Sequence, residues 1–187
     1  MQIRQVTIEG FRGIRFFDWR PDAAVGCLIG PGDSTKTTIL DAVEYVLSSR
    51  WTVPIADTDF HGGRFRAPIA ITATVGQLPS LLLQEEKFGL DLRGWNQEAG
   101  LKDEPEGADE AVLTIRFSVD DSLEPSWLVI NDRRPEGRLI SAKDREALGL
   151  VRLGGDIDRH LSWTRGSVLS RQTDKVAEIG RVLAEAH

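Results

Sequence analysis

The sequence VGCLIGPGDSTKTTIL, residues 25–40, is the stretch on which the predicted fold depends. It opens with a short apolar run at 25–29, which is typical of a buried strand. A tight turn of glycine, proline and aspartate follows at 30–33, and apolar residues then recur at helical spacing. Strand, loop and helix in this order bring backbone N–H groups and a helix dipole toward an anion. The stretch therefore predicts a phosphate-binding loop.

The loop fits the pattern G-x-x-x-x-G-K-[ST] at Gly30, Lys36 and Thr37, but Thr35 stands where the pattern has a glycine. An ordinary strand–turn–helix corner with a solvent-exposed lysine is the alternative. The helix is expected to begin at Thr35 or Lys36 and to end near 48–49, because its apolar residues recur every three or four positions.

Composition indicates a water-soluble globular domain. The 187 residues can bury one substantial core, and no apolar run is long enough to span a membrane. A single cysteine, Cys27, lies inside the apolar run, and the N-terminus has no secretory pattern, so we expect a cytoplasmic protein. The net charge of −6 argues against non-specific binding of nucleic acid by the whole chain.

Three portions are expected within one lobe, 1–187. Residues 1–50 carry a short strand with Ile3, Val6 and Ile8 that is interrupted at 11–13, a strand at 14–19, and the loop with its helix. Residues 65–153 are mainly antiparallel, because polarity alternates at 69–75 and 113–119. Further strands are expected at 127–130 and 150–153, short helices at 80–87 and from 141, a loop at 93–108 and a turn at 133–137. Residues 156–187 are expected to be helical, with a helix at 174–185.

These pieces resemble a known group of proteins. Residues 8–14, IEGFRGI, resemble the x-N-F-R strand that begins the SMC/RecF-like branch of ABC-type ATPases. Residues 30–38, GPGDSTKTT, are similar to its G-P-N-G-S-G-K-S/T loop, and LDAVE at 40–44 is similar to its L-D-A-I helix. Residues 57–60 and 163–167 look closest to the OLD-like subgroup, whose members commonly couple an ATPase head to a Toprim nuclease.

The resemblance implies an α/β fold, in which a P-loop strand–loop–helix core joins a largely antiparallel β portion, as in the N-terminal lobe of an ABC-type head. It implies ATP and Mg²⁺ as ligands. Lys36 would meet the β- and γ-phosphates, the Thr37 hydroxyl would bind Mg²⁺, and Arg12 would lie beside the nucleotide. The implied nucleotide-binding residues are Arg12, Gly30, Pro31, Gly32, Asp33, Ser34, Thr35, Lys36, Thr37 and Thr38.

Two residues depart from the family loop, because Asp33 and Thr35 replace glycines. A phosphate nest needs left-handed residues, which aspartate tolerates and a β-branched threonine adopts at a cost of ~1–2 kcal/mol. Either the loop keeps this strain, or it is rearranged with Thr35 at negative φ. We expect the rearranged loop and weak binding.

The catalytic half of such an ATPase is not found in the sequence. The segment 113–121 ends in two aspartates, but its alternating polarity is that of a half-exposed strand rather than a buried Walker B strand. No signature loop or Toprim carboxylate cluster is found, so no catalytic residue is assigned and turnover by this chain alone is not expected.

The sequence predicts an ATP-binding lobe of an OLD-like ATPase, part of an ATP-dependent nuclease or a DNA-processing or defence protein. Its partners would be a C-terminal ATPase/nuclease half or partner head and, in the complete protein, nucleic acid. The alternative is a degenerate P-loop module that binds no nucleotide and acts as an interaction scaffold.

Other residues are expected to have structural roles. The tryptophans are too dispersed for a base-stacking platform and are predicted to pack. Asp57 and Asp59 are expected to be solvated or to cap backbone groups.

Overall fold

The computed structural model describes residues 1–63, 67–153, 162 and 173. Residues Met1–Leu150 form one unit, and most of the second, Val151–His187, lies outside the described residues. The helix expected at 174–185 and the motif at 163–167 are therefore not tested. None of the described helices is long and apolar enough to cross a membrane.

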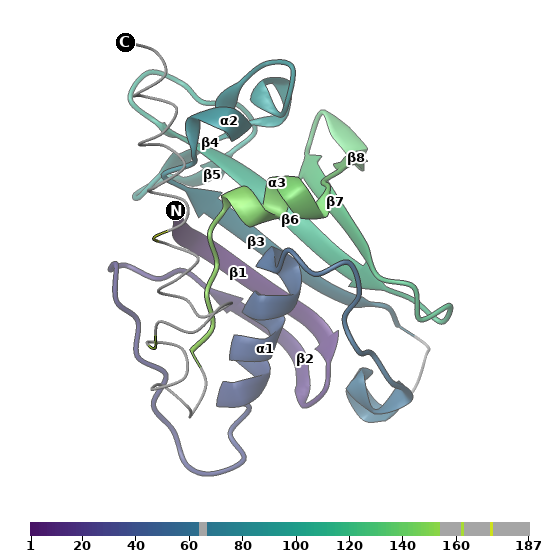
Figure 1. Cartoon of the computed structure of the whole chain (residues 1–187). Helices are drawn as coiled ribbons and strands as arrows, with labels where there is room; N and C mark the ends of the chain where they lie inside the picture. The colour runs from purple at the N-terminus through teal and green to yellow at the C-terminus, as the bar shows by residue number, and fades with distance from the viewer. Residues whose placement is uncertain (64–66, 154–161, 163–172, 174–187) are drawn as a thin grey trace. The chain divides into compact units, whose positions relative to one another are not determined.

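An antiparallel sheet with strand order β2-β1-β3-β6-β4-β5, in which β7 pairs with β6 and β8, dominates the first unit (Figure 1). Ile8 of β1 pairs with Ile71 of β3, which pairs with Phe117 of β6, so alternate apolar residues share one face. The strands expected at 69–75 and 113–119 are thus confirmed. The described strands are β1 (Gln2–Phe11), β2 (Ile14–Trp19), β3 (Ile69–Gly76), β4 (Arg93–Asn96), β5 (Gly100–Lys102), β6 (Glu110–Val119), β7 (Ser126–Asn131) and β8 (Arg134–Leu139).

Helix α1 (Lys36–Leu47) lies across one face of this sheet (Figure 1). It buries Ile39, Ala42, Tyr45, Val46 and Leu47, which is the apolar stripe that the sequence predicts. The helix ends at Ser48, whose backbone is extended. The indole N–H of Trp127 donates to the Tyr45 carbonyl at 2.9 Å and fixes the helix to β7.

Helix α3 (Ala142–Ala147) supports the end of α1 through Arg145. This buried guanidinium donates to the carbonyl oxygens of Ser48 at 2.7 Å, Ile140 at 2.9 Å and Arg50 at 2.9 Å. It also stacks 4.1 Å from the centre of the Trp127 ring. Burial lowers the pKa of Arg145 to about 10, because the charged form loses its hydration.

The strand expected at 25–29 is wrong. No strand is assigned there, and the side chains of Val25 and Ile29 are 85% and 90% exposed. Cys27 is exposed as well. Among the described residues no strand pairs with this segment, and of its apolar side chains Leu28 is half-buried against the core. Of the predicted strand–loop–helix core, the structure thus confirms the helix, and the phosphate-binding role of the loop stays a prediction.

Four further predictions are wrong. The expected loop at 93–108 contains β4 and β5, residues 134–137 of the turn expected at 133–137 belong to β8, and 150–153 forms no strand. Trp51 is 81% exposed instead of packed. The helix at 80–87 is shorter, as α2 (Ser80–Leu83). The described short 3₁₀ turns are η1 (Asp57–Asp59), η2 (His61–Gly63) and η3 (Gly89–Asp91).

Candidate functional site

The loop before α1 has the alternating backbone of an anion-binding nest. Asp33 has φ 55° and Thr35 has φ 62°, both left-handed, whereas Ser34 between them is not left-handed and Lys36 is helical. Such alternation directs successive N–H groups toward a common point. The expected rearrangement of the loop, with Thr35 at negative φ, is therefore wrong. Threonine is held in the left-handed region in spite of its branched side chain.

Lys36, the first residue of α1, closes the loop on itself. Its ammonium donates to the carbonyl oxygens of Gly30 at 2.8 Å and Pro31 at 2.5 Å, and to Ser34 Oγ at 2.8 Å. A phosphate entering the loop would compete with these three oxygens for the ammonium. The described first turn of α1 contains no acidic residue, so the helix dipole there favours an anion.

Gly30 is needed for this closure, whereas Gly32 is not. A Cβ at Gly30 would lie 2.7 Å from Ser34 Oγ and 3.8 Å from Lys36 Nζ. A Cβ at Gly32 would have no described atom within 4 Å. The first glycine of the motif thus makes room for the contacts of Lys36, and the second lies in open space.

Arg12 is held by two carboxylates. Its Nε donates to Asp59 Oδ1 at 2.7 Å, and its Nη1 forms an ion pair with Asp41 of α1. Burial lowers the pKa of Arg12, but the hydrogen bonds to Asp59 and Asp41 outweigh it and raise the pKa above its ordinary value. Asp59 also accepts from the Ala56 N–H at 2.9 Å, so the capping role expected for it is confirmed.

Sequence reasoning missed Asp41 and Asp59 as partners of Arg12. Asp41 lies on the side of the amphipathic helix that the spacing assigns to solvent, and nothing in the sequence pairs position 59 with position 12. The structure brings together the predicted residues at 30–38, and it joins Arg12 to them through α1. The place of Arg12 beside a nucleotide stays a prediction.

The loop is chemically suited to a triphosphate with its cation. Among the described residues no cluster of His, Cys, Asp and Glu could hold a metal ion by itself. Mg²⁺ is commonly bound through one or two protein oxygens together with phosphate oxygens. The Thr37 hydroxyl, on an exposed residue in the first turn of α1, fits that role. The exposed Asp33 carboxylate adds a negative charge that would oppose phosphates.

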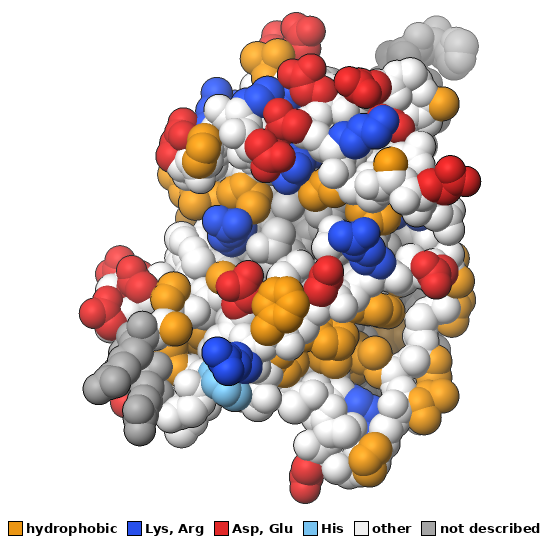
Figure 2. Space-filling model, turned by 180° about the vertical axis from the view of Figure 1, so that it is seen from behind, with side chains coloured by type: hydrophobic (Ala, Val, Ile, Leu, Met, Phe, Trp, Pro, Cys, Tyr) orange, Lys and Arg blue, Asp and Glu red, His pale blue; other side chains and the backbone are white. Residues whose placement is uncertain are grey.

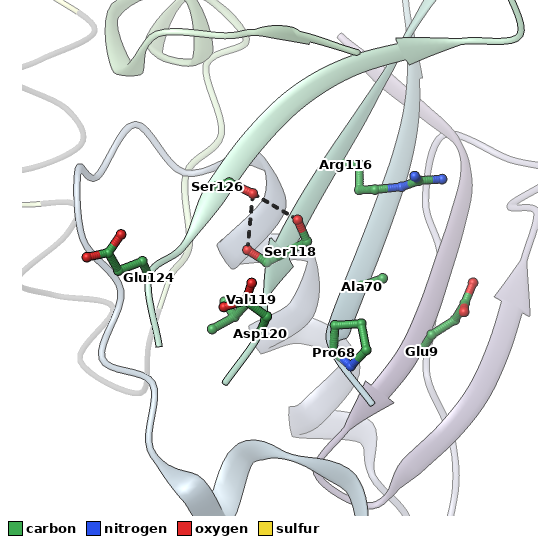
Figure 3. A pocket seen from close by; sticks show the side chains of 9 residues that line it. All are labelled: Glu9, Pro68, Ala70, Arg116, Ser118, Val119, Asp120, Glu124 and Ser126. Atoms are coloured by element: carbon green, nitrogen blue, oxygen red, sulfur yellow. Dashed lines mark hydrogen bonds between the residues drawn. The ribbon is translucent and has the colours of Figure 1, made fainter. Parts of the chain in front are cut away.

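A separate hollow of about 440 Å³ lies on the sheet (Figure 3). Ser118 and Ser126 line it and their hydroxyls hydrogen-bond at 2.8 Å, whereas the side chain of Arg116 extends away from the two serines (Figure 3). Figure 2 shows acidic and basic side chains interspersed on the face seen from behind. The residues that line the hollow are Glu9, Pro68, Ala70, Arg116, Ser118, Val119, Asp120, Glu124 and Ser126. With three carboxylates to one guanidinium, it is a poor site for nucleic acid.

Comparison with known proteins identifies a fold. No family model matches the sequence, and no curated protein matches it. Among solved structures, a similar chain comes from a study of the structural biochemistry of ATP-driven dimerization and DNA-stimulated activation of SMC ATPases. The TM-score is 0.53 at 15% identity, over 92% of this chain and 96% of that chain. This chain therefore shares the fold of that SMC ATPase chain.

Proposed function

We propose that this chain is the ATP-binding lobe of an ABC-type ATPase. The observation that carries the proposal is the loop at 30–36, in which left-handed Asp33 and Thr35 precede Lys36 at the start of α1. In such a lobe the backbone N–H groups and Lys36 would bind the β- and γ-phosphates, and Thr37 would hold Mg²⁺. Bound Mg²⁺ would neutralise part of the phosphate charge and would thereby reduce the repulsion between the phosphates and the Asp33 carboxylate.

The lobe would work with a second half. Val25 and Ile29 are almost fully exposed, and Leu40 of α1 is 52% exposed. Exposed apolar side chains before and after the loop in the sequence are consistent with a partner that covers them. A strand from a C-terminal ATPase half would pair with 25–29 and would bring the acidic groups that hydrolysis requires. A partner head would complete the site in the same way.

The wider role is proposed from the motifs. The resemblance of 57–60 to OLD-like ATPases supports an ATP-dependent nuclease or a DNA-processing or defence protein in the cytoplasm. Nucleic acid would then be a partner of the complete protein; on the face seen in Figure 2, acidic and basic side chains are interspersed.

Calorimetric titration of the purified chain with Mg-ATP tests the proposal. Lys36→Ala removes the ammonium from the loop and should weaken binding at least tenfold, since a charged hydrogen bond to phosphate is worth ~1.5–3 kcal/mol. Lys143→Ala, an exposed lysine of α3, is the matched control for loss of one positive charge. Failure of the wild-type chain to bind, or equal binding by Lys36→Ala, would contradict the proposal.

The scaffold alternative has one observation in its favour. The ammonium of Lys36 already has three oxygen acceptors from its own loop, so the loop can be stable without a phosphate. If that state prevails, the lobe would bind its partner with the same affinity with and without Mg-ATP.

A further inference from the structure

The turn between β1 and β2, formed by Arg12 and Gly13, is fixed to other elements on one side. The Arg12 N–H donates to the Asp59 carbonyl at 2.6 Å, and the Arg12 carbonyl lies 2.8 Å from His61 Nδ1. The Arg12 side chain is held by Asp41 and Asp59. With backbone and side chain both bound, this turn has little freedom to move away from a neighbour.

The other side of the turn meets the phosphate loop. A Cβ at Gly13 would lie 2.9 Å from Cγ2 of Thr35, so the threonine methyl rests where a side chain at position 13 would be. The Thr35 hydroxyl donates to the Ser34 carbonyl at 2.6 Å. Both branches of the strained threonine therefore have a neighbour. Thr35 directly precedes Lys36, and its carbonyl accepts the Ile39 N–H at 3.0 Å within α1.

We propose that Gly13 is a positioning residue of the phosphate loop. The braced turn forms a seat for the Thr35 methyl, and only glycine at position 13 leaves that seat open. A side chain there would push Thr35, and with it the start of α1 and Lys36, out of the geometry that binds phosphate. This inference rests on the proposed function. Thr35 departs from the family loop, and Gly13, which lies outside the loop, leaves the space that the Thr35 methyl group occupies.

A double-mutant cycle tests the pair. The Gly13 backbone lies outside the left-handed region, so Gly13→Ala introduces the methyl clash without backbone strain. It should weaken Mg-ATP binding about tenfold, since overpacking a fitted contact commonly costs that much. Thr35→Ser deletes Cγ2 and keeps the hydroxyl. Gly13→Ala combined with Thr35→Ser should bind within about twofold of Thr35→Ser alone, because the clash is gone.

The same proteins are measured by calorimetry for Mg-ATP and by urea unfolding without ligand. Rescue of Gly13→Ala by Thr35→Ser in binding supports the inference. Wild-type affinity in Gly13→Ala, or no rescue, overturns it. If the wild-type chain binds no Mg-ATP, the proposed function fails. The free energies of unfolding then test the contact between positions 13 and 35. If the effects of the two substitutions on the free energy of unfolding are additive, the proposed contact is refuted.

Discussion

Gly30→Ala should disable the phosphate loop although it adds a single methyl group. The new Cβ would lie 2.7 Å from Ser34 Oγ and 3.5 Å from Ser34 Cβ, where ordinary contacts begin at about 3.4 Å. To relieve the contact, either Ser34 must turn its hydroxyl away or the loop must open. Both routes remove the 2.8 Å hydrogen bond from Lys36 Nζ to Ser34.

The magnitude follows from these two costs. Overpacking a fitted site costs about 1–3 kcal/mol, and every ~1.4 kcal/mol is a tenfold change in affinity. We therefore expect Gly30→Ala to weaken Mg-ATP binding by about tenfold or more. The fold should remain intact, because Gly30 is exposed and contributes nothing to the core.

Calorimetry on matched alanine variants checks this expectation. Gly32→Ala adds the same methyl to the same loop, but no described atom lies within 4 Å of it, so its affinity should fall less than about threefold. Ser34→Ala removes the atom that is struck, so Gly30→Ala should cost little in that background. The reasoning is refuted if Gly30→Ala and Gly32→Ala bind alike, or if Ser34→Ala leaves the full defect.

Three further predictions concern strain, pH and burial. Thr35→Gly removes the cost of a left-handed threonine and should tighten Mg-ATP binding by up to about tenfold, for ~1.4 kcal/mol of strain; unchanged affinity in calorimetry would contradict this. Burial raises the pKa of Asp144, but hydrogen bonds from Ser141 and Lys87 outweigh it and hold the pKa below its ordinary value. The resulting stability is present above pH ~4 and is lost as the pH falls through the lowered pKa, so Asp144→Asn should flatten the acid limb of urea unfolding measured from pH 6 to 2. Arg145→Met leaves three carbonyl oxygens without their donor and should lower the free energy of unfolding by ~2–4 kcal/mol, whereas Lys143→Ala on the same helix should change it by less than ~0.5 kcal/mol.

The elements with strong periodicity could be predicted from the sequence. The helix at Lys36–Leu47 and the strands around Ile71 and Phe117 have an apolar stripe or strict alternation, which local sequence alone specifies. Strands β4 and β5 could not be predicted this way. They are short, and β4 is fixed by pairing with β6, where Trp95 lies opposite Glu110. Such pairing joins positions that no local pattern connects.

The sequence selects the residues of the loop, and their binding of a nucleotide stays a prediction, whereas the backbone of the loop could not be predicted. Spacing identified Gly30, Lys36 and Thr37, because a motif fixes residue types at fixed intervals. The left-handed Thr35 was not expected, since the propensity of threonine argues against it. In the tertiary structure the methyl group of Thr35 lies where a Cβ at Gly13 would be, a contact between positions that no local pattern connects. The strand predicted at 25–29 is wrong because an apolar run indicates burial but does not specify a strand with which it pairs, and Val25 and Ile29 are exposed.

The strand order has a kinetic consequence for this lobe. β1 and β3 are neighbours in the sheet, yet β2, the phosphate loop and α1 lie between them in the chain. Their pairing must close a long loop. The conformational entropy of that loop is lost before the contacts between β1 and β3 can stabilise the sheet, so folding is expected to be slow. Helix α1 packs on the face that this pairing creates. The C-terminal end of the phosphate loop, where α1 begins, is therefore held in place only after the sheet has formed. A nucleotide that binds there would therefore prolong the life of the folded lobe by slowing its unfolding, and would do little to speed its formation.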